Sequence, residues 1–152
     1  MKLDLLVLAF GVGVFLAVHL AMNAQVGQTV GNPRMGNAAF WLIGAVMAVV
    51  IALSGWDSQF FTRAREVPAW LWVAGAVGAC LVFAIAALIP RLGAATTNVL
   101  LLAGQLLGGL LIAHFGLLSS PVQPLNSARL VGAVIMILGA SIAVVGRLPF
   151  VR

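Results

Sequence analysis

Charged residues are the scarcest feature of this sequence. Only 7% of its 152 residues are Asp, Glu, Lys or Arg, whereas 63% are hydrophobic. Soluble domains contain about one quarter charged residues and about half apolar ones, so this composition excludes an ordinary soluble domain. A bilayer core about 30 Å thick needs roughly 20 apolar residues per helix, and the chain has room for about five such helices. The composition therefore predicts an integral membrane protein.

Acidic residues are rarer still, and each lies near the end of a long apolar run or in a loop. The three acids are Asp4, Asp57 and Glu66. A buried carboxylate is the usual proton or cation carrier in pumps and exchangers, so its absence argues against an antiporter that works through a central glutamate. No acid, metal cluster or nucleophile–base pair is available at membrane depth either. We therefore predict that the chain is not an enzyme.

Cysteine and histidine are also sparse, with one cysteine, Cys80, and two histidines. A single cysteine cannot form an internal disulfide, and three such residues far apart in the sequence do not predict a metal site. The net charge is +5, but the eight basic residues are scattered singly and do not interleave with aromatic residues. This pattern argues against nucleic-acid binding. We expect no metal and no other cofactor.

Five apolar runs are long enough to cross a bilayer, at about residues 3–22, 38–54, 68–89, 94–115 and 128–145. None alternates with period two, which argues against a barrel, and backbone groups in lipid must be bonded internally. The predicted fold is all-α, a polytopic membrane helical bundle in a single transmembrane domain, 1–152. Pro68 is expected in the first turn of the third span and Pro90 at its end. Residues 32–37, NPRMGN, are expected to form a turn.

The first apolar run shares features with a signal peptide. Lys2 precedes an apolar core, and residues 21–24, AMNA, resemble a cleavage site. Asp4 is atypical of a signal peptide, and the apolar core is long enough to span the bilayer. We expect this run to be a membrane span.

The basic residues do not favour one membrane orientation. With five spans, four fall on each side: Lys2, Arg63, Arg65 and Arg129 on one, and Arg34, Arg91, Arg147 and Arg152 on the other. An excess of Lys and Arg in cytoplasmic loops normally sets orientation. The balance predicts dual topology, in which copies insert both ways and pair as an antiparallel dimer, like the inverted repeats of larger transporters. A fixed orientation, with an oppositely oriented partner, is the alternative.

Four polar side chains within the spans are candidates to line a solute pathway: Gln105, His19, Asn23 and Asn98. His19 and Asn23 share one helical face, as do Asn98 and Gln105. The alternative is that they bond a neighbouring helix and only hold the bundle together, at less than about 2 kcal/mol each, and we favour it for Asn98. His19 is the one candidate proton carrier, although a neutral, hydrogen-bonding ring is an equal prediction. His114 is expected to cap carbonyls at the end of its span.

Small residues form two stripes that favour close helix packing. Gly104 and Gly108 lie four residues apart in the fourth span, and Gly132 and Gly139 lie seven apart in the fifth. Such stripes occur in dimer interfaces, but packing within one chain is the commoner use.

Residues 98–140 resemble the YdcZ-like family of half-sized, five-helix proteins in the drug/metabolite transporter superfamily. The features that carry the resemblance, in this order and spacing, are Gly104-Gln105, His114-Phe115-Gly116, Pro124, Arg129 and Gly132. Residues 23–24 and 32–46 fit the family's first loop and second span more loosely. Residues 132–139 also resemble the dimer-forming last helix of small multidrug resistance proteins, which implies a dimer role for the Gly132/Gly139 stripe.

The resemblance implies transport by dual-topology single chains, oppositely oriented pairs or fused chains. Two positions depart from the family pattern: Ala113 replaces an acid, and His19 replaces a glutamine. A mechanism that depends on that acid cannot be transferred to this chain.

These observations together predict a small secondary transporter in the bacterial inner membrane. We expect it to work by alternating access as an antiparallel homodimer, or with an oppositely oriented paralogue, and to move a small polar solute that is neutral or anionic. A non-transporting structural or regulatory subunit of a membrane complex is the alternative function.

Overall fold

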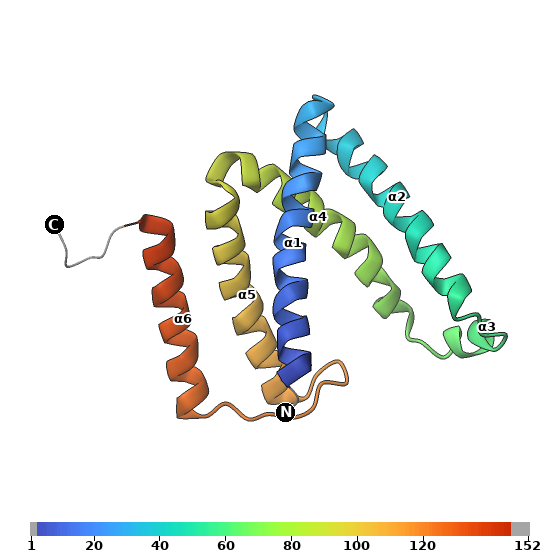
Figure 1. Ribbon diagram of the computed structural model, residues 1–152. Helices are drawn as coiled ribbons and strands as arrows, with labels where there is room; N and C mark the ends of the chain where they lie inside the picture. Colours follow the sequence, from blue (N-terminus) through green and yellow to red (C-terminus); the bar gives the residue numbers. More distant parts are fainter. Residues whose placement is uncertain (1–2, 147–152) are drawn as a thin grey trace. The chain divides into compact units, whose positions relative to one another are not determined.

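The computed structural model describes residues 3–146, so Lys2, Arg147 and Arg152 of the charge balance lie outside the described residues. Its helices are α1 (Leu3–Thr29), α2 (Pro33–Ser54), α3 (Phe60–Ala64), the 3₁₀ helix η1 (Ala69–Trp72), α4 (Val73–Leu92), α5 (Ala94–Phe115) and α6 (Ser127–Val145) (Figure 1). Residues 3–146 contain no strand. Five segments are long and apolar enough to cross a membrane: α1, α2, η1 with α4, α5 and α6. The predicted all-α fold with five spans is confirmed.

The chain forms two compact units, Met1–Arg91 and Leu92–Arg152. Helix α1 packs on α2 in the first unit, and α5 packs on α6 in the second. Few side chains are buried within either unit, and most large apolar side chains are exposed. Exposed apolar side chains are what lipid or a second protein would cover in a membrane. That the two units form one transmembrane domain stays a prediction.

The junction between α1 and α2 is tighter than the sequence suggested. Helix α1 continues through the polar residues up to Thr29, and Gly31, at φ +67°, makes the turn. Asn32 then caps α2, because its side-chain oxygen accepts hydrogen bonds from the backbone N–H groups of Arg34 and Met35, both at 3.2 Å. Pro33 follows at the first helical position, which needs no N–H donor. The expected turn over residues 32–37 is therefore wrong, since α2 begins inside it.

The expected end of the third span at Pro90 is also wrong, because α4 continues to Leu92. A proline has a helical φ and removes one hydrogen bond, here the one that the Ala86 carbonyl would accept. So close to the end of the helix, this loss does not stop it. Gly93, at φ +82°, breaks the helix instead. At the other end, Pro68 precedes a 3₁₀ turn rather than lying inside an α-helical first turn.

The closest packing between α1 and α2 is a contact between two glycine backbones, which we call the glycine crossing. A Cβ added to Gly36 would lie 2.8 Å from the Gly27 Cα, closer than real Cβ atoms approach. Leu20 and Ala24 are buried on the same part of α1. The two helices diverge away from their connecting turn (Figure 1), so this contact fixes where they can interact.

The glycine stripes noted in the sequence lie elsewhere. A Cβ added to Gly104, Gly108, Gly132 or Gly139 would meet nothing within 4 Å. These four residues therefore do not create the α5–α6 contact, and their packing against a second chain stays a prediction.

The glycine crossing predicts a position-specific cost for one added methyl group. Gly36→Ala should destabilise the protein by about 1–3 kcal/mol, because the methyl group meets backbone that cannot move aside. Gly44→Ala, in the same helix, is the matched control, since its methyl group would contact nothing within 4 Å. The measurement is the thermal unfolding midpoint of both variants in detergent. Equal midpoints would contradict the packing described.

Candidate functional site

Asn23 is the most deeply buried polar side chain of the first unit, at 1% exposed. Its Nδ2 donates a hydrogen bond to Asn37 Oδ1 at 3.2 Å, which joins α1 to α2 one turn from the glycine crossing. Its Oδ1 is buried and accepts no hydrogen bond from the residues that the structure describes. A buried carboxamide oxygen without a donor is costly, so this position holds a hydrogen-bonding capacity that the folded chain does not use.

His19 lies one helical turn before Asn23 and contacts α2 through its ring. The ring centroids of His19 and Phe40 are 4.7 Å apart, and the planes are tilted by 53°. The side chain is otherwise exposed. We call His19, Asn23, Asn37 and Phe40 the polar junction. The structure thus brings together the two candidates from α1, as their spacing indicates.

Asn37 and Phe40 were missed by the sequence analysis, which placed residues 32–37 in a turn. The sequence signal that could have placed them is Asn32 followed by Pro33. This pattern is typical of a helix start, and it puts Asn37 in the second turn of α2 rather than in a loop. From there Asn37 and Phe40 lie on neighbouring positions of one helical face, three residues apart.

Two pockets lie beside the polar junction, where α4 approaches α1 and α2. The first, of about 260 Å³, is lined by Arg34, Asn37, Ala79, Cys80 and Phe83. The second, of about 240 Å³, is lined by residues of three helices: Ala24, Gly27, Gln28, Pro33, Ala86, Ala87, Pro90 and Arg91. Each pocket therefore combines apolar walls with one arginine and one amide side chain.

The electrostatics of these pockets are set by unpaired arginines. Within residues 3–146, the one salt bridge joins Arg63 to Asp57, at 2.7 Å. Arg34 and Arg91 have no carboxylate partner there. Two spans separate them in the chain, so both lie at the same membrane face, and that face is cationic.

The two candidates of α5 are in different situations. Asn98 Nδ2 donates to the Ala94 carbonyl of its own helix at 2.9 Å, so it bonds neither a neighbouring helix nor Gln105. Gln105 is exposed. Helix α5 faces α6 through Val99 and Ala103, and Gln105 lies about 200° around the helix from Ala103. Helix α6 therefore does not cover Gln105.

The segment between α5 and α6 is held by residues that the sequence analysis singled out. Gly116 ends α5 at φ +63°, where a Cβ would lie 2.6 Å from Val122 Cγ2, so both its conformation and its space require glycine. Arg129 donates from Nη1 to the Pro124 carbonyl at 2.8 Å and from Nη2 to Gln123 Oε1 at 2.9 Å. The charge of Arg129 therefore lies with this loop, as the count of basic residues on each side of the membrane assumed.

The expected role of His114 is wrong. It does not donate to the terminal carbonyls of α5; its Nδ1 accepts a hydrogen bond from the Leu125 N–H at 3.1 Å. The loop backbone returns to the end of α5, and Gln123 N–H also donates to the Ala113 carbonyl at 2.8 Å. His114 therefore holds the loop by accepting a hydrogen bond at Nδ1, whereas a histidine that caps a carbonyl donates one.

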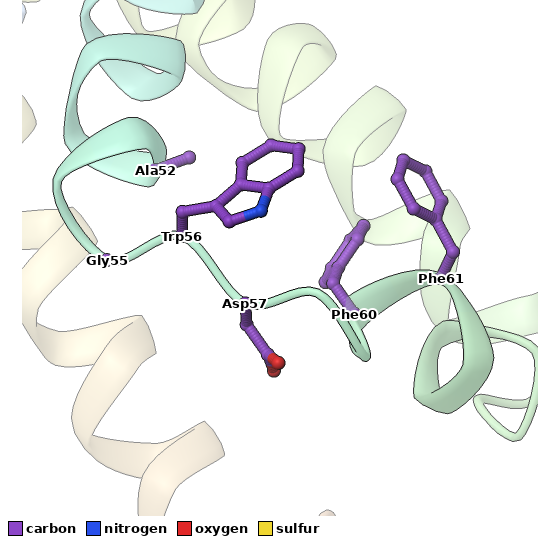
Figure 2. Close-up of a pocket in the computed structure, with 6 residues that line it drawn as sticks. All are labelled: Ala52, Gly55, Trp56, Asp57, Phe60 and Phe61. Atoms are coloured by element: carbon purple, nitrogen blue, oxygen red, sulfur yellow. The ribbon is translucent and has the colours of Figure 1, made fainter.

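A third pocket, of about 270 Å³, lies where α2 leads into α3. Figure 2 shows Trp56 and Phe60 on its two sides, with the Asp57 carboxylate pointing away from the rings. That carboxylate bonds Arg63 and the Gln59 N–H. The exposed aromatic side chains suit a membrane interface, where such rings are enriched. The described residues contain no group of three His, Cys, Asp or Glu that could hold a metal ion.

Comparison with known proteins gives a consistent result. A family model described as "Putative inner membrane exporter, YdcZ" matches residues 5–142. The chain is also similar to the inner membrane protein YdcZ of Escherichia coli (strain K12), at 30% identity over 141 residues, which cover 89% of this chain and 92% of that protein. The chain belongs to the YdcZ family. No solved structure matches it.

Membership in the YdcZ family confirms the resemblance found in the sequence and the place of the chain in the drug/metabolite transporter superfamily. The chain is a multi-pass protein of the inner membrane. The family description is that of an exporter rather than an enzyme. The signature positions 114, 116, 124 and 129 now have a shared structural role, because all of them shape the α5–α6 loop.

The His114 contact predicts a local effect on the loop. His114→Phe keeps a ring but removes the acceptor for the Leu125 N–H. The net value of one hydrogen bond is about 1 kcal/mol, so hydrogen exchange of the Leu125 amide should accelerate about fivefold. Leu111→Ala is the control, since the Leu111 side chain is exposed on the same helix. Unchanged exchange in His114→Phe, measured by mass spectrometry, would show that the contact does not hold the loop.

Proposed function

We propose that this chain is a small secondary transporter that works by alternating access as an antiparallel, dual-topology dimer. Its cargo is a small polar solute that is neutral or anionic. His19, Asn23 and Gln105 line the pathway, whereas Asn98 bonds a carbonyl of its own helix. The family is described as an exporter, and this proposal adds the mechanism, the class of cargo and the pathway residues for this chain.

The observation that carries the proposal is the unused oxygen of Asn23. A polar group at membrane depth is expensive and is usually functional. Helix packing alone would favour satisfying both ends of the amide, whereas a solute pathway needs an acceptor that is free until cargo or water arrives. The neighbouring His19 ring, exposed and one turn away, extends the same polar surface.

The charges support a neutral or anionic cargo. No acid lies in the middle of a described span, and Asp57 is already paired with Arg63. The two pockets beside the polar junction contain Arg34 and Arg91, both without a carboxylate partner in the described part of the chain. A cation would meet repulsion there and find no counter-charge.

Dimerisation is supported by the face of α5 that α6 leaves uncovered. Gln105 lies on the face of α5 away from α6, and an amide in lipid needs a partner or a wet cavity. Gly104 and Gly108 next to it leave room for a close neighbour. The balance of basic residues supports pairing with a copy of opposite orientation, which would place two equivalent polar junctions around one central site.

Dual topology predicts two populations of C-termini. Cys80→Ala removes the native thiol, and a single cysteine added after Arg152 reports the side of the membrane. An impermeant thiol reagent applied to right-side-out and to inverted vesicles should label comparable fractions. Labelling from one side alone would contradict the homodimer and indicate a partner of opposite orientation.

The pathway role predicts that one side chain is needed for export but not for assembly. Cells that overproduce the protein should release at least one polar neutral or anionic solute into the medium, measured by untargeted mass spectrometry. Gln105→Ala should reduce this release at least about tenfold, the effect of losing about 1.4 kcal/mol of interaction in the transport step. Leu107→Ala, an exposed apolar position on the same helix, is the control.

Full release by a Gln105→Ala variant that still dimerises would remove Gln105 from the pathway. No release by the native protein, together with co-purification of a dissimilar membrane protein, would favour a non-transporting subunit instead.

A further inference from the structure

The pocket lined by Arg34, Asn37, Ala79, Cys80 and Phe83 places a charged side chain next to the interior of a membrane span. Arg34 lies in the first turn of α2. Cys80 is the eighth of the twenty residues of α4, well inside that helix. The pocket therefore extends from the cationic membrane face toward the middle of α4.

Arg34 is exposed in the first turn of α2, so its guanidinium is accessible to a group of opposite charge. Charged side chains within membrane spans usually pair with another group or mark a functional site. Arg34 has no carboxylate partner among residues 3–146, and Asp57 is held by Arg63 beyond the opposite end of α2. A group that pairs with Arg34 therefore comes from outside the described chain.

The amides beside Arg34 specify the kind of group that would fit. Asn37 Oδ1 accepts from Asn23 Nδ2, so the Asn37 Nδ2 remains free to donate. The nearby helix start does not supply donors, because Asn32 already accepts from the N–H groups of Arg34 and Met35. A guanidinium with an adjacent amide donor matches a carboxylate or phosphate, which arginine binds through two parallel hydrogen bonds. Phe83 gives such a group an apolar wall.

We propose that this pocket binds the oxyanion of the cargo, so that the transported solute carries a carboxylate or a phosphate. The proposal rests on the proposed function and narrows its cargo to an anionic solute. The pocket with Gln28 and Arg91 extends the cationic surface through which the solute approaches, because Arg91 lies about two to three turns further along α4.

The native cysteine provides the test, because Cys80 lines the pocket and is exposed. Purified protein in a maltoside detergent, free of lipid, is reacted with two methanethiosulfonate reagents, one anionic (sulfonatoethyl) and one cationic (trimethylammonioethyl). The ratio of the two rates at Cys80 cancels changes in thiol reactivity and reports the local charge. Arg34→Gln should lower the anionic-to-cationic ratio at least about threefold, and Arg34→Lys should keep it.

Arg65→Gln is the matched control, since it removes the same charge at the other membrane face and should leave the ratio unchanged. An equal ratio in the native protein and in Arg34→Gln would overturn the anion site. Should Arg34→Gln fail to fold, protection of native Cys80 by millimolar acetate or inorganic phosphate, with no protection by neutral glycerol, decides the question.

Two further outcomes separate the possible sources of the oxyanion. Protection of Cys80 by soluble acetate or phosphate supports a solute site. Protection by phosphatidylglycerol alone would overturn it in favour of a lipid headgroup. The labelling needs no transport, so a failed anion site would leave the dimeric transporter standing. Missing export with intact charge selectivity would instead remove the transporter and leave an anion site without a cargo role.

Discussion

The backbone contact between Gly27 and Gly36 is the constraint on which the first unit depends. A side chain at either glycine would push α1 and α2 apart near their connecting turn. At this separation the Asn23 amide reaches Asn37, and the His19 ring lies against Phe40. The polar junction and the two arginine pockets beside it all use residues within a few turns of this contact. In lipid there is no hydrophobic driving force between helices, so close packing of small residues stabilises their contact through van der Waals interactions. Here the same packing also positions the polar groups.

Polar side chains in the spans divide into two groups by how they satisfy their hydrogen bonds. Thr97, Asn98 and Ser141 each donate to the backbone carbonyl four residues earlier, so these bonds need no neighbouring helix. Asn23 and Gln105 do not use this local solution. Asn23 keeps a buried oxygen without a donor, and Gln105 lies outside the α5–α6 contact. The residues that the fold leaves unsatisfied are therefore the ones that support the proposed pathway.

The sequence predicts the helices better than it predicts their junctions. The length of each apolar run predicts a span, because every backbone group in lipid must be bonded within its helix. The predicted span 94–115 has the same bounds as α5. The helix boundaries at Pro90 and at residues 32–37 were predicted wrongly. A helix cap, or a proline near a helix end, changes only one or two hydrogen bonds, and a hydropathy pattern carries no information about these. The Gly27–Gly36 contact depends on the turn at Gly31, and the His114–Leu125 bond depends on a folded loop. Pairs of this kind are set by tertiary geometry, so helical spacing could place His19 beside Asn23 but could not supply Asn37.

Water access at residue 23 tests the central claim, that the polar junction belongs to a solute pathway, most directly. With Cys80 replaced by Ala, Asn23→Cys and Val46→Cys are compared in membranes with a small hydrophilic thiol reagent, which reacts only where water ionises the thiol. Val46 is 64% exposed on α2 and would face lipid. The account predicts that the cysteine at residue 23 reacts much faster, although the native side chain there is 1% exposed. A cysteine at residue 23 as unreactive as the one at residue 46 would contradict it and leave the junction as helix packing alone.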